Sequence, residues 1–130
     1  MKDFIIISII LIIIIRGAIY TQKYIDKTCH ELTEDLNDLK KMMIDIKQSG
    51  DSEDIVKKVN EIYNKWEETE EGWAIIVLHS ELDLIETSFI RMKTAIEEDE
   101  INRGLEELET SIFLINHISE KEKFCLKNIF

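Results

Sequence analysis

The sequence predicts an all-α protein in which an N-terminal transmembrane helix continues into an antiparallel, up-down four-helix bundle. Three observations carry this prediction. The 130-residue chain has no proline and only four glycines, so little in it interrupts a helix. Ten of the twelve residues from Phe4 to Ile15 are isoleucine or leucine. Beyond Thr21, apolar residues recur at alternating spacings of three and four, which indicates helices packed on helices.

The segment from Phe4 to Ile15 decides where the protein lies. As a helix it covers about 18 Å, and Arg16 to Tyr20 extend it to about 25 Å, the low end for a bilayer span. Arg16 is expected to reach the interface, with Tyr20 and Tyr24 at the headgroups. We therefore predict a membrane anchor over residues 1–20 and a helical bundle over residues 21–130.

A cleaved signal peptide is the main rival interpretation of the same segment. Its apolar core would have a suitable length. Cleavage, however, requires small residues in an A-x-A-like pattern, and Arg16-Gly17-Ala18 places an arginine in that position. A buried core helix is disfavoured because the segment has no polar face. An uncleaved single-pass anchor fits best.

The basic residues around the anchor bear on its orientation. Lys2 precedes the apolar segment, and Arg16, Lys23 and Lys27 come after it, which favours a cytoplasmic bundle. A long domain translocates largely regardless of charge, and N-terminal signal-anchors usually export the domain on their C-terminal side. We expect a single-pass protein of the cell membrane with its bundle on the extracytoplasmic side.

The charge of the bundle restricts its partners. Residues 21–130 contain all but one of the 27 acidic residues and all but two of the 16 basic ones. Such an acidic surface repels DNA, RNA and anionic lipid headgroups, so nucleic-acid binding is excluded. The expected partners are the lipid bilayer, through residues 4–20, and a protein partner or a second copy of the chain.

The first two bundle helices are predicted over residues 21–48 and 52–70. Gly50 suits the end of the first, and Asp51 or Ser52 the N-cap of the second. A charged segment ending at Gly72 is expected to separate the second helix from the third. The predicted core positions are Ile25, Cys29, Leu32, Leu36, Leu39, Met43 and Ile46, followed by Ile55, Val59, Ile62 and Trp66.

The third and fourth helices are predicted over residues 73–97 and 100–127. Trp73 to Leu78 is apolar throughout, so we expect the third helix to be covered on several sides at its start. Asp99 is a candidate N-cap for the fourth helix. The predicted core positions are Ile75, Leu78, Leu82, Ile85, Phe89, Met92 and Ile96, followed by Ile101, Leu105, Leu108, Ile112 and Ile115.

The two cysteines and several aromatic residues are expected at the membrane end of the bundle. Up-down topology places Cys29 and Cys125 near each other, either as a disulfide or as two buried free thiols. Trp66 and Trp73 suit the core, the membrane interface or a partner surface, in that order. The aromatic residues expected near the membrane are Tyr20, Tyr24, Trp66, Trp73 and Phe130.

Four side chains are weak candidates for a metal site. Folding the third helix back on the fourth brings His79 to the level of His117, with Glu81 and Glu120 close by. Half-exposed histidines of a bundle surface are the more common interpretation. The sequence contains no nucleophile motif and no phosphate-binding glycine loop, so we expect no enzyme activity and no cofactor.

Several stretches of the C-terminal half carry a family resemblance. They are His79 to Glu86, Arg91-Met92-Lys93, His117-Ile118 with Glu120 and Glu122, and Phe124 to Phe130. The chain resembles a bacterial family known as domain of unknown function 4363, whose members are similar in having an N-terminal hydrophobic segment. The resemblance implies the same architecture and membrane placement, brings no assigned activity, and draws attention to His79, Glu81 and His117.

These observations predict a membrane-anchored helical interaction or accessory module without catalytic activity. It would bind a membrane or envelope partner, or itself, through its heptad faces. The alternative hypothesis is a ligand- or metal-binding sensor domain that uses the level of His79 and His117.

Overall fold

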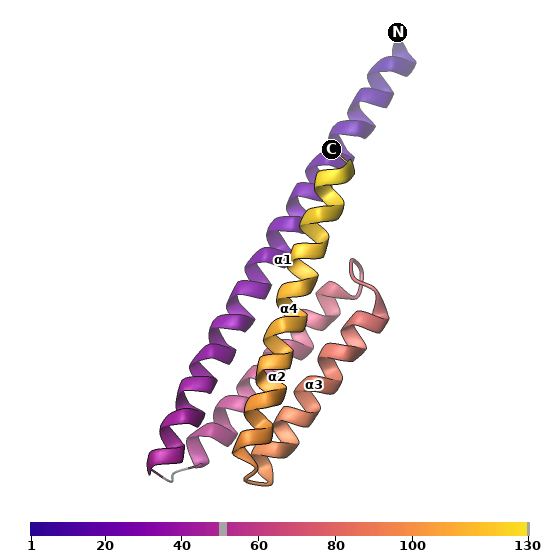
Figure 1. Ribbon diagram of the computed structural model, residues 1–130. Coiled ribbons are helices and arrows are strands. Elements are labelled where there is room, and N and C mark those ends of the chain that lie inside the picture. Colours follow the sequence, from indigo (N-terminus) through magenta and orange to yellow (C-terminus); the bar gives the residue numbers. More distant parts are fainter. Residues whose placement is uncertain (50–51, 130) are drawn as a thin grey trace.

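The computed structural model describes residues 1–49 and 52–129, without the side chains of residues 48, 49, 126 and 129. These residues form four α-helices: α1 (Lys2–Ser49), α2 (Glu53–Trp73), α3 (His79–Glu97) and α4 (Ile101–Ile129). The helices alternate in direction, and each packs against two neighbours in the ring order α1, α2, α3, α4 (Figure 1). The predicted all-α, four-helix fold is confirmed.

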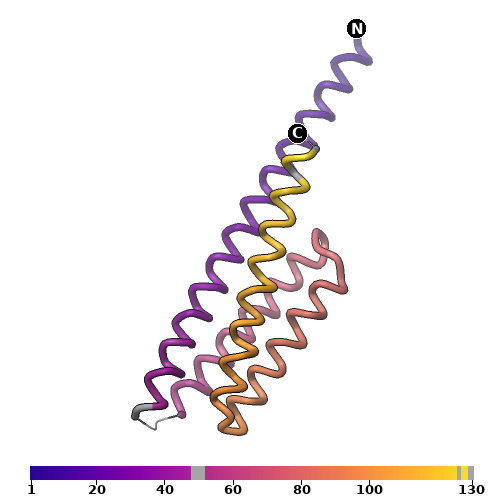
Figure 2. Tube along the Cα trace, in the orientation of Figure 1, coloured from indigo at the N-terminus to yellow at the C-terminus, as the bar shows by residue number. Residues whose placement is uncertain are grey.

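α1 is one continuous helix through both the apolar segment and the first member of the bundle. It holds no proline and only one glycine, Gly17, in its 48 residues, so nothing in it forces a break. Its N-terminal turns extend beyond the other helices, whereas the rest of α1 runs along α2 and α4 (Figures 1 and 2).

The bundle core is built from the apolar positions that recur at spacings of three and four. The predicted positions of α1 and α2 are buried, apart from half-buried Ile46. The core also contains Trp73 at the end of α2, Val77 of the following turn, five residues of α3 (Leu82, Ile85, Phe89, Met92 and Ile96) and three of α4 (Leu108, Ile115 and Ile118). In α4, the predicted positions Ile101, Leu105 and Ile112 are only half-buried.

The predicted start of the third helix is wrong. Gly72 does not end α2 early, because α2 continues to Trp73, and residues 74–78 then form the turn that leads to His79. Val77 is buried, but the predicted core residues Ile75 and Leu78 are 90% and 63% exposed. A turn places successive side chains in different directions, so the helical period that assigned them to the core does not apply there.

The turn between α3 and α4 also differs from the prediction. Asp99 has a φ of 61°, which is the left-handed conformation typical of the residue after a helix C-terminus rather than of an N-cap. The Glu100 N–H donates to the Ala95 carbonyl at 2.8 Å, and the Asp99 N–H donates to that of Ile96 at 3.1 Å. These bonds close α3, and α4 begins at Ile101. The predicted helix end at Gly50 and the alternative cap Asp51 lie outside the described residues.

The two ends of the bundle differ in the segments they contain. The end of the bundle from which the apolar segment of α1 projects is named the anchor end, after the predicted anchor, and the opposite end the far end. The anchor end contains the turn 74–78 and the last turns of α4, and the last turns of α4 lie along α1 (Figure 1). The far end contains the end of α1, the start of α2 and the turn 98–100. Asp26 of α1 accepts a hydrogen bond from Ser119 of α4 at 2.7 Å, which fixes the register of these two helices.

Candidate interaction surface

A shallow groove runs between α3 and α4 on the outside of the bundle, in the half nearer the anchor end. Its volume is about 250 Å³, and it is lined by Glu81, Leu84, Phe113, Leu114, His117 and Ile118. Leu84 is 57% exposed and Phe113 is 67% exposed, whereas Ile118 at the base is buried. The groove therefore presents large apolar side chains to solvent beside a floor that belongs to the core.

Helix periodicity explains why these residues share a surface. Phe113 and His117 are four residues apart on α4, so they lie one above the other on the same face. Their rings are stacked, with centroids 6.1 Å apart and planes inclined by 16°. Glu81 and Leu84 are three residues apart on α3 and form the opposite wall. The stacked rings therefore form the α4 wall of the groove.

An ion pair closes the groove on the side of the anchor end. The Lys121 ammonium donates to Glu81 Oε1 at 2.6 Å, and this hydrogen bond raises the pKa of Lys121. Burial raises the pKa of Glu122, the residue next to Lys121. The groove thus combines an apolar floor with a charged rim, which is the usual composition of a protein-binding surface.

The four candidate metal ligands do not converge. Glu81 and His117 share the groove, but Glu81 is engaged by Lys121. His79 is exposed at the start of α3, where its charge acts on Glu70 of α2. Glu120 is also exposed, and its charge acts on Cys29 of α1. Among the described residues, no group of three or more possible ligands forms a metal site.

The structure does not bring the two cysteines together. The Cys29 thiol is buried against α4, 3.6 Å from both the Ile115 carbonyl and Asn116 Oδ1, and burial raises its pKa. Cys125 is exposed, and both thiols are free. Because Cys125 lies nine residues beyond Asn116, it is about 13 Å further along α4 than a disulfide with Cys29 requires.

The aromatic residues predicted near the membrane divide into two groups. Tyr20 is 75% exposed at the anchor end, and Tyr24 is half-buried there. Trp66 and Trp73 are core residues, because both are fully buried and their rings meet edge to face with centroids 5.9 Å apart. Trp73 also donates to Thr28 Oγ1 at 2.8 Å. Phe130 lies outside the described residues.

Comparison with known proteins assigns this arrangement to a family. The family model described as Domain of unknown function (DUF4363) matches residues 19–129. The chain belongs to the DUF4363 family. No curated protein and no solved structure matches the chain.

The DUF4363 match covers the packed part of the molecule. It begins at Ile19, so it includes the bundle portion of α1, the whole of α2 and α3, and α4 to Ile129. The groove between α3 and α4 lies inside the matched residues, and the segment from Phe4 to Ile15 lies outside them. The family therefore accounts for the bundle and supplies no activity for it.

A polar cluster between α2 and α3 was not predicted from the sequence. Glu86 of α3 accepts hydrogen bonds from the Tyr63 hydroxyl at 2.5 Å and from the Trp66 indole N–H at 2.6 Å. The bond to Glu86 raises the pKa of Tyr63 to about 12. Lys93 lies over the Tyr63 ring, 5.2 Å from its centroid. Tyr63 and Trp66 are three residues apart on α2, so both donors lie on one helix face. This spacing is the sequence feature that could have indicated the cluster.

Proposed function

We propose that this DUF4363 protein is a membrane-anchored helical interaction module without catalytic activity. The observation that carries the proposal is the continuity of α1, in which an uncovered apolar helix and a packed bundle helix are one element. α1 has the length and composition to cross a membrane, and its apolar window is not buried within the structure. Burying such a surface in lipid is strongly favourable.

The two ends of the bundle support the same placement. At the anchor end, the turn 74–78 consists only of apolar residues, and Ile75 and Leu78 are exposed. Tyr20 and Phe124 are exposed on the helices beside it. At the far end, the turn into α4 is acidic, from Glu97 to Glu100. An end rich in exposed apolar side chains suits a bilayer interface, and an acidic end suits water.

The proposed membrane anchor is tested by substitutions that should release the protein from the membrane. We expect the full chain to stay with membranes during alkaline extraction. Changing Ile9→Arg and Ile13→Arg together puts two charges at the centre of the apolar segment, each costing about 3 kcal/mol, and should release the protein. The matched control, Ile44→Arg with Ile90→Arg, alters two exposed bundle isoleucines and should leave the protein in the membrane. Equal extraction of both variants would contradict the anchor.

The groove between α3 and α4 is the proposed partner site. Its exposed Leu84 and Phe113 suit an apolar side chain from a helix of another membrane protein or of a second copy of this chain. A photo-crosslinker at Phe113 should give a discrete product, whose mass separates a second copy from a different partner. The same crosslinker at Asn64, an exposed residue of α2 away from this groove, should give none. Identical products at both positions would rule out a specific site.

The side of the membrane is tested at Cys125. This thiol is exposed and Cys29 is buried, so a membrane-impermeant maleimide reports on Cys125 in the folded protein. We propose an extracytoplasmic bundle and expect labelling in intact cells. Labelling that requires membrane disruption would place the bundle in the cytoplasm.

A further inference from the structure

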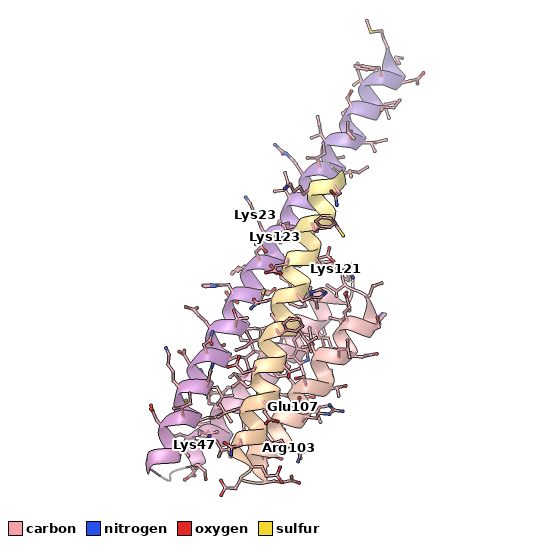
Figure 3. All side chains as sticks on the ribbon, viewed as in Figure 1. Lys23, Lys47, Arg103, Glu107, Lys121 and Lys123 are labelled. Atoms are coloured by element: carbon pink, nitrogen blue, oxygen red, sulfur yellow. The ribbon has the colours of Figure 1, made fainter. Side chains whose placement is uncertain are left out.

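The charge of the bundle changes sign toward the anchor end. Residues 28–118 contain 23 acidic and nine basic residues, whereas residues 16–27 and 119–129 together contain three acidic and six basic ones. The ion pair of Lys123 with Asp26, at 3.4 Å, shows that these two segments lie side by side. Figure 3 shows Lys23, Lys121 and Lys123 toward this end, and Lys47 and Arg103 at the far end. The repulsion of anionic headgroups expected from overall composition therefore does not apply to the anchor end.

Part of this basic region is a hollow on the surface of α1. It has a volume of about 270 Å³ and is lined by Tyr20, Lys23, Tyr24 and Lys27. The spacing i, i+3, i+4, i+7 places all four side chains on one helix face, and this face is turned away from the contacts of Asp26 with α4. The Tyr24 hydroxyl packs beside Gly72 of α2, which holds one wall in place.

The two lysines of the hollow are available to a ligand. Within the described part of the chain, Lys23 forms no ion pair. Lys27 meets Glu31 only at 4.0 Å, with 74% of its side chain exposed. The two ammonium groups and the exposed Tyr20 hydroxyl can donate several hydrogen bonds to one anion, and phosphate oxygens accept such bonds well.

The position of the hollow, directly after the apolar segment of α1, indicates that the phosphate belongs to a lipid headgroup. Tyr20 lies where the apolar segment meets the bundle, so Lys23 and Lys27 come one and two helical turns after it. Basic side chains immediately beside a membrane span are attracted to anionic lipids. We propose that Lys23 and Lys27, together with the exposed Tyr20 hydroxyl, bind the phosphate of an anionic phospholipid headgroup, with Tyr24 as the wall of the site. This inference rests on the proposed anchor.

The test compares lipid selectivity in the full chain. The protein is reconstituted in phosphatidylcholine vesicles containing spin-labelled phosphatidylglycerol or spin-labelled phosphatidylcholine, and the motionally restricted fraction is measured for each. The wild type should prefer phosphatidylglycerol, with each lysine contributing about fivefold to the relative association constant. Lys23→Gln with Lys27→Gln should abolish most of this preference. Lys41→Gln with Lys57→Gln, which removes two exposed bundle lysines, should preserve it.

Three results would overturn the inference. The first is an unchanged preference in the Lys23/Lys27 variant. The second is equal loss in the Lys41/Lys57 control. The third is full competition by inorganic phosphate at matched ionic strength, which would assign the hollow to a free anion. Flotation with the vesicles is scored separately, because failure to float with either lipid contradicts the anchor itself, whereas flotation without selectivity contradicts only the headgroup site.

Discussion

Tyr24 of α1 occupies the space that a side chain at Gly72 of α2 would need. A Cβ atom at Gly72 would lie 2.0 Å from the Tyr24 hydroxyl oxygen and 2.9 Å from the ring carbon that bears it. This close approach joins α1 to α2 at the anchor end, one turn below Tyr20. It also explains why a glycine is accommodated inside α2, where it weakens the helix.

Gly72→Ala should therefore destabilise the protein despite the higher helix propensity of alanine. The ring of Tyr24 must move, and we expect the free energy of unfolding to fall by about 1 kcal/mol. In a Tyr24→Ala background the obstacle is absent, so the same change should stabilise by about 0.5 kcal/mol. Urea denaturation of the full chain in neutral detergent, monitored by circular dichroism, measures both values.

Gly17→Ala is the matched control for this cycle, because nothing lies within 4 Å of the new methyl group. It should be neutral or slightly stabilising. An effect of the same sign for Gly72→Ala in both backgrounds would show that Tyr24 does not fill this space.

The polar cluster around Glu86 should be visible in a tyrosine titration. One of the three tyrosines should ionise near pH 12, because the Tyr63 hydroxyl donates to Glu86 and its pKa is raised to about 12. A phenol whose pKa is higher in the folded state binds its proton more tightly there. The stabilisation of the folded protein by the protonated Tyr63 is therefore complete below pH 10 and is lost as the pH rises toward 12.

Glu86→Gln removes the charge that holds this proton. The late step in absorbance at about 295 nm should then move down toward the ordinary value of about 10, and the loss of a charged acceptor should cost about 1–2 kcal/mol. If the late step persists in Glu86→Gln, Tyr63 is not the residue that titrates there.

Glu70 gives a second pH-dependent prediction, in which the substitution stabilises the protein instead of destabilising it. Burial, followed by the neighbouring charges of Glu86, Asp83 and Glu67, raises its pKa. A carboxyl with a raised folded pKa destabilises the folded state once it ionises, and this cost is absent below its unfolded pKa of 4.5. Glu70→Gln should therefore stabilise the protein at about pH 7 by about 0.5 kcal/mol. The gain should vanish below pH 4.5, and a gain that persisted there would contradict the electrostatic cause.

Two small residues hold α3 and α4 together. The hydroxyls of Ser88 and Ser111 are 2.9 Å apart and buried, and both also approach the Glu107 carbonyl, at 3.0 and 2.9 Å. Ser111→Ala should cost only about 1 kcal/mol, because Ser88 keeps another acceptor. Ser111→Leu should cost about 3 kcal/mol, because the larger side chain must separate the helices. Equal thermal unfolding of the two variants would contradict close packing at this level.

Much of the fold can be predicted from apolar spacing, and the exceptions have identifiable causes. Leu32 and Leu36 of α1 are buried as the heptad pattern predicts. In α4 the pattern favoured Leu105 and Ile112 as core positions, but these two residues are only half-buried. The buried face of α4 includes Gly104 and Ser111 instead, and a search for apolar residues does not select a glycine or a serine. The turn 74–78 was predicted to be helical because its residues are all apolar and include no glycine or proline.

The surface features were harder to predict because they depend on register. The sequence placed His79 and His117 at one level, but a level does not fix the direction of a side chain around each helix. Likewise, up-down topology put Cys29 and Cys125 at the same end, yet α4 continues past the level of Cys29 and carries Cys125 beyond it. The basic character of the anchor end depends on the register of α4 against α1, because this register brings residues 119–129 beside residues 16–27.

The central proposal is that α1 is embedded in a bilayer and that the anchor end of the bundle faces this bilayer. A nitroxide on Cys125 in lipid nanodiscs tests it most directly, through the ratio of its collisions with oxygen and with a water-soluble nickel chelate. The account predicts a clearly higher ratio at Cys125 than at Asp99→Cys in a Cys125→Ser background, because Asp99 lies at the far end. Equal ratios at the two positions would contradict it.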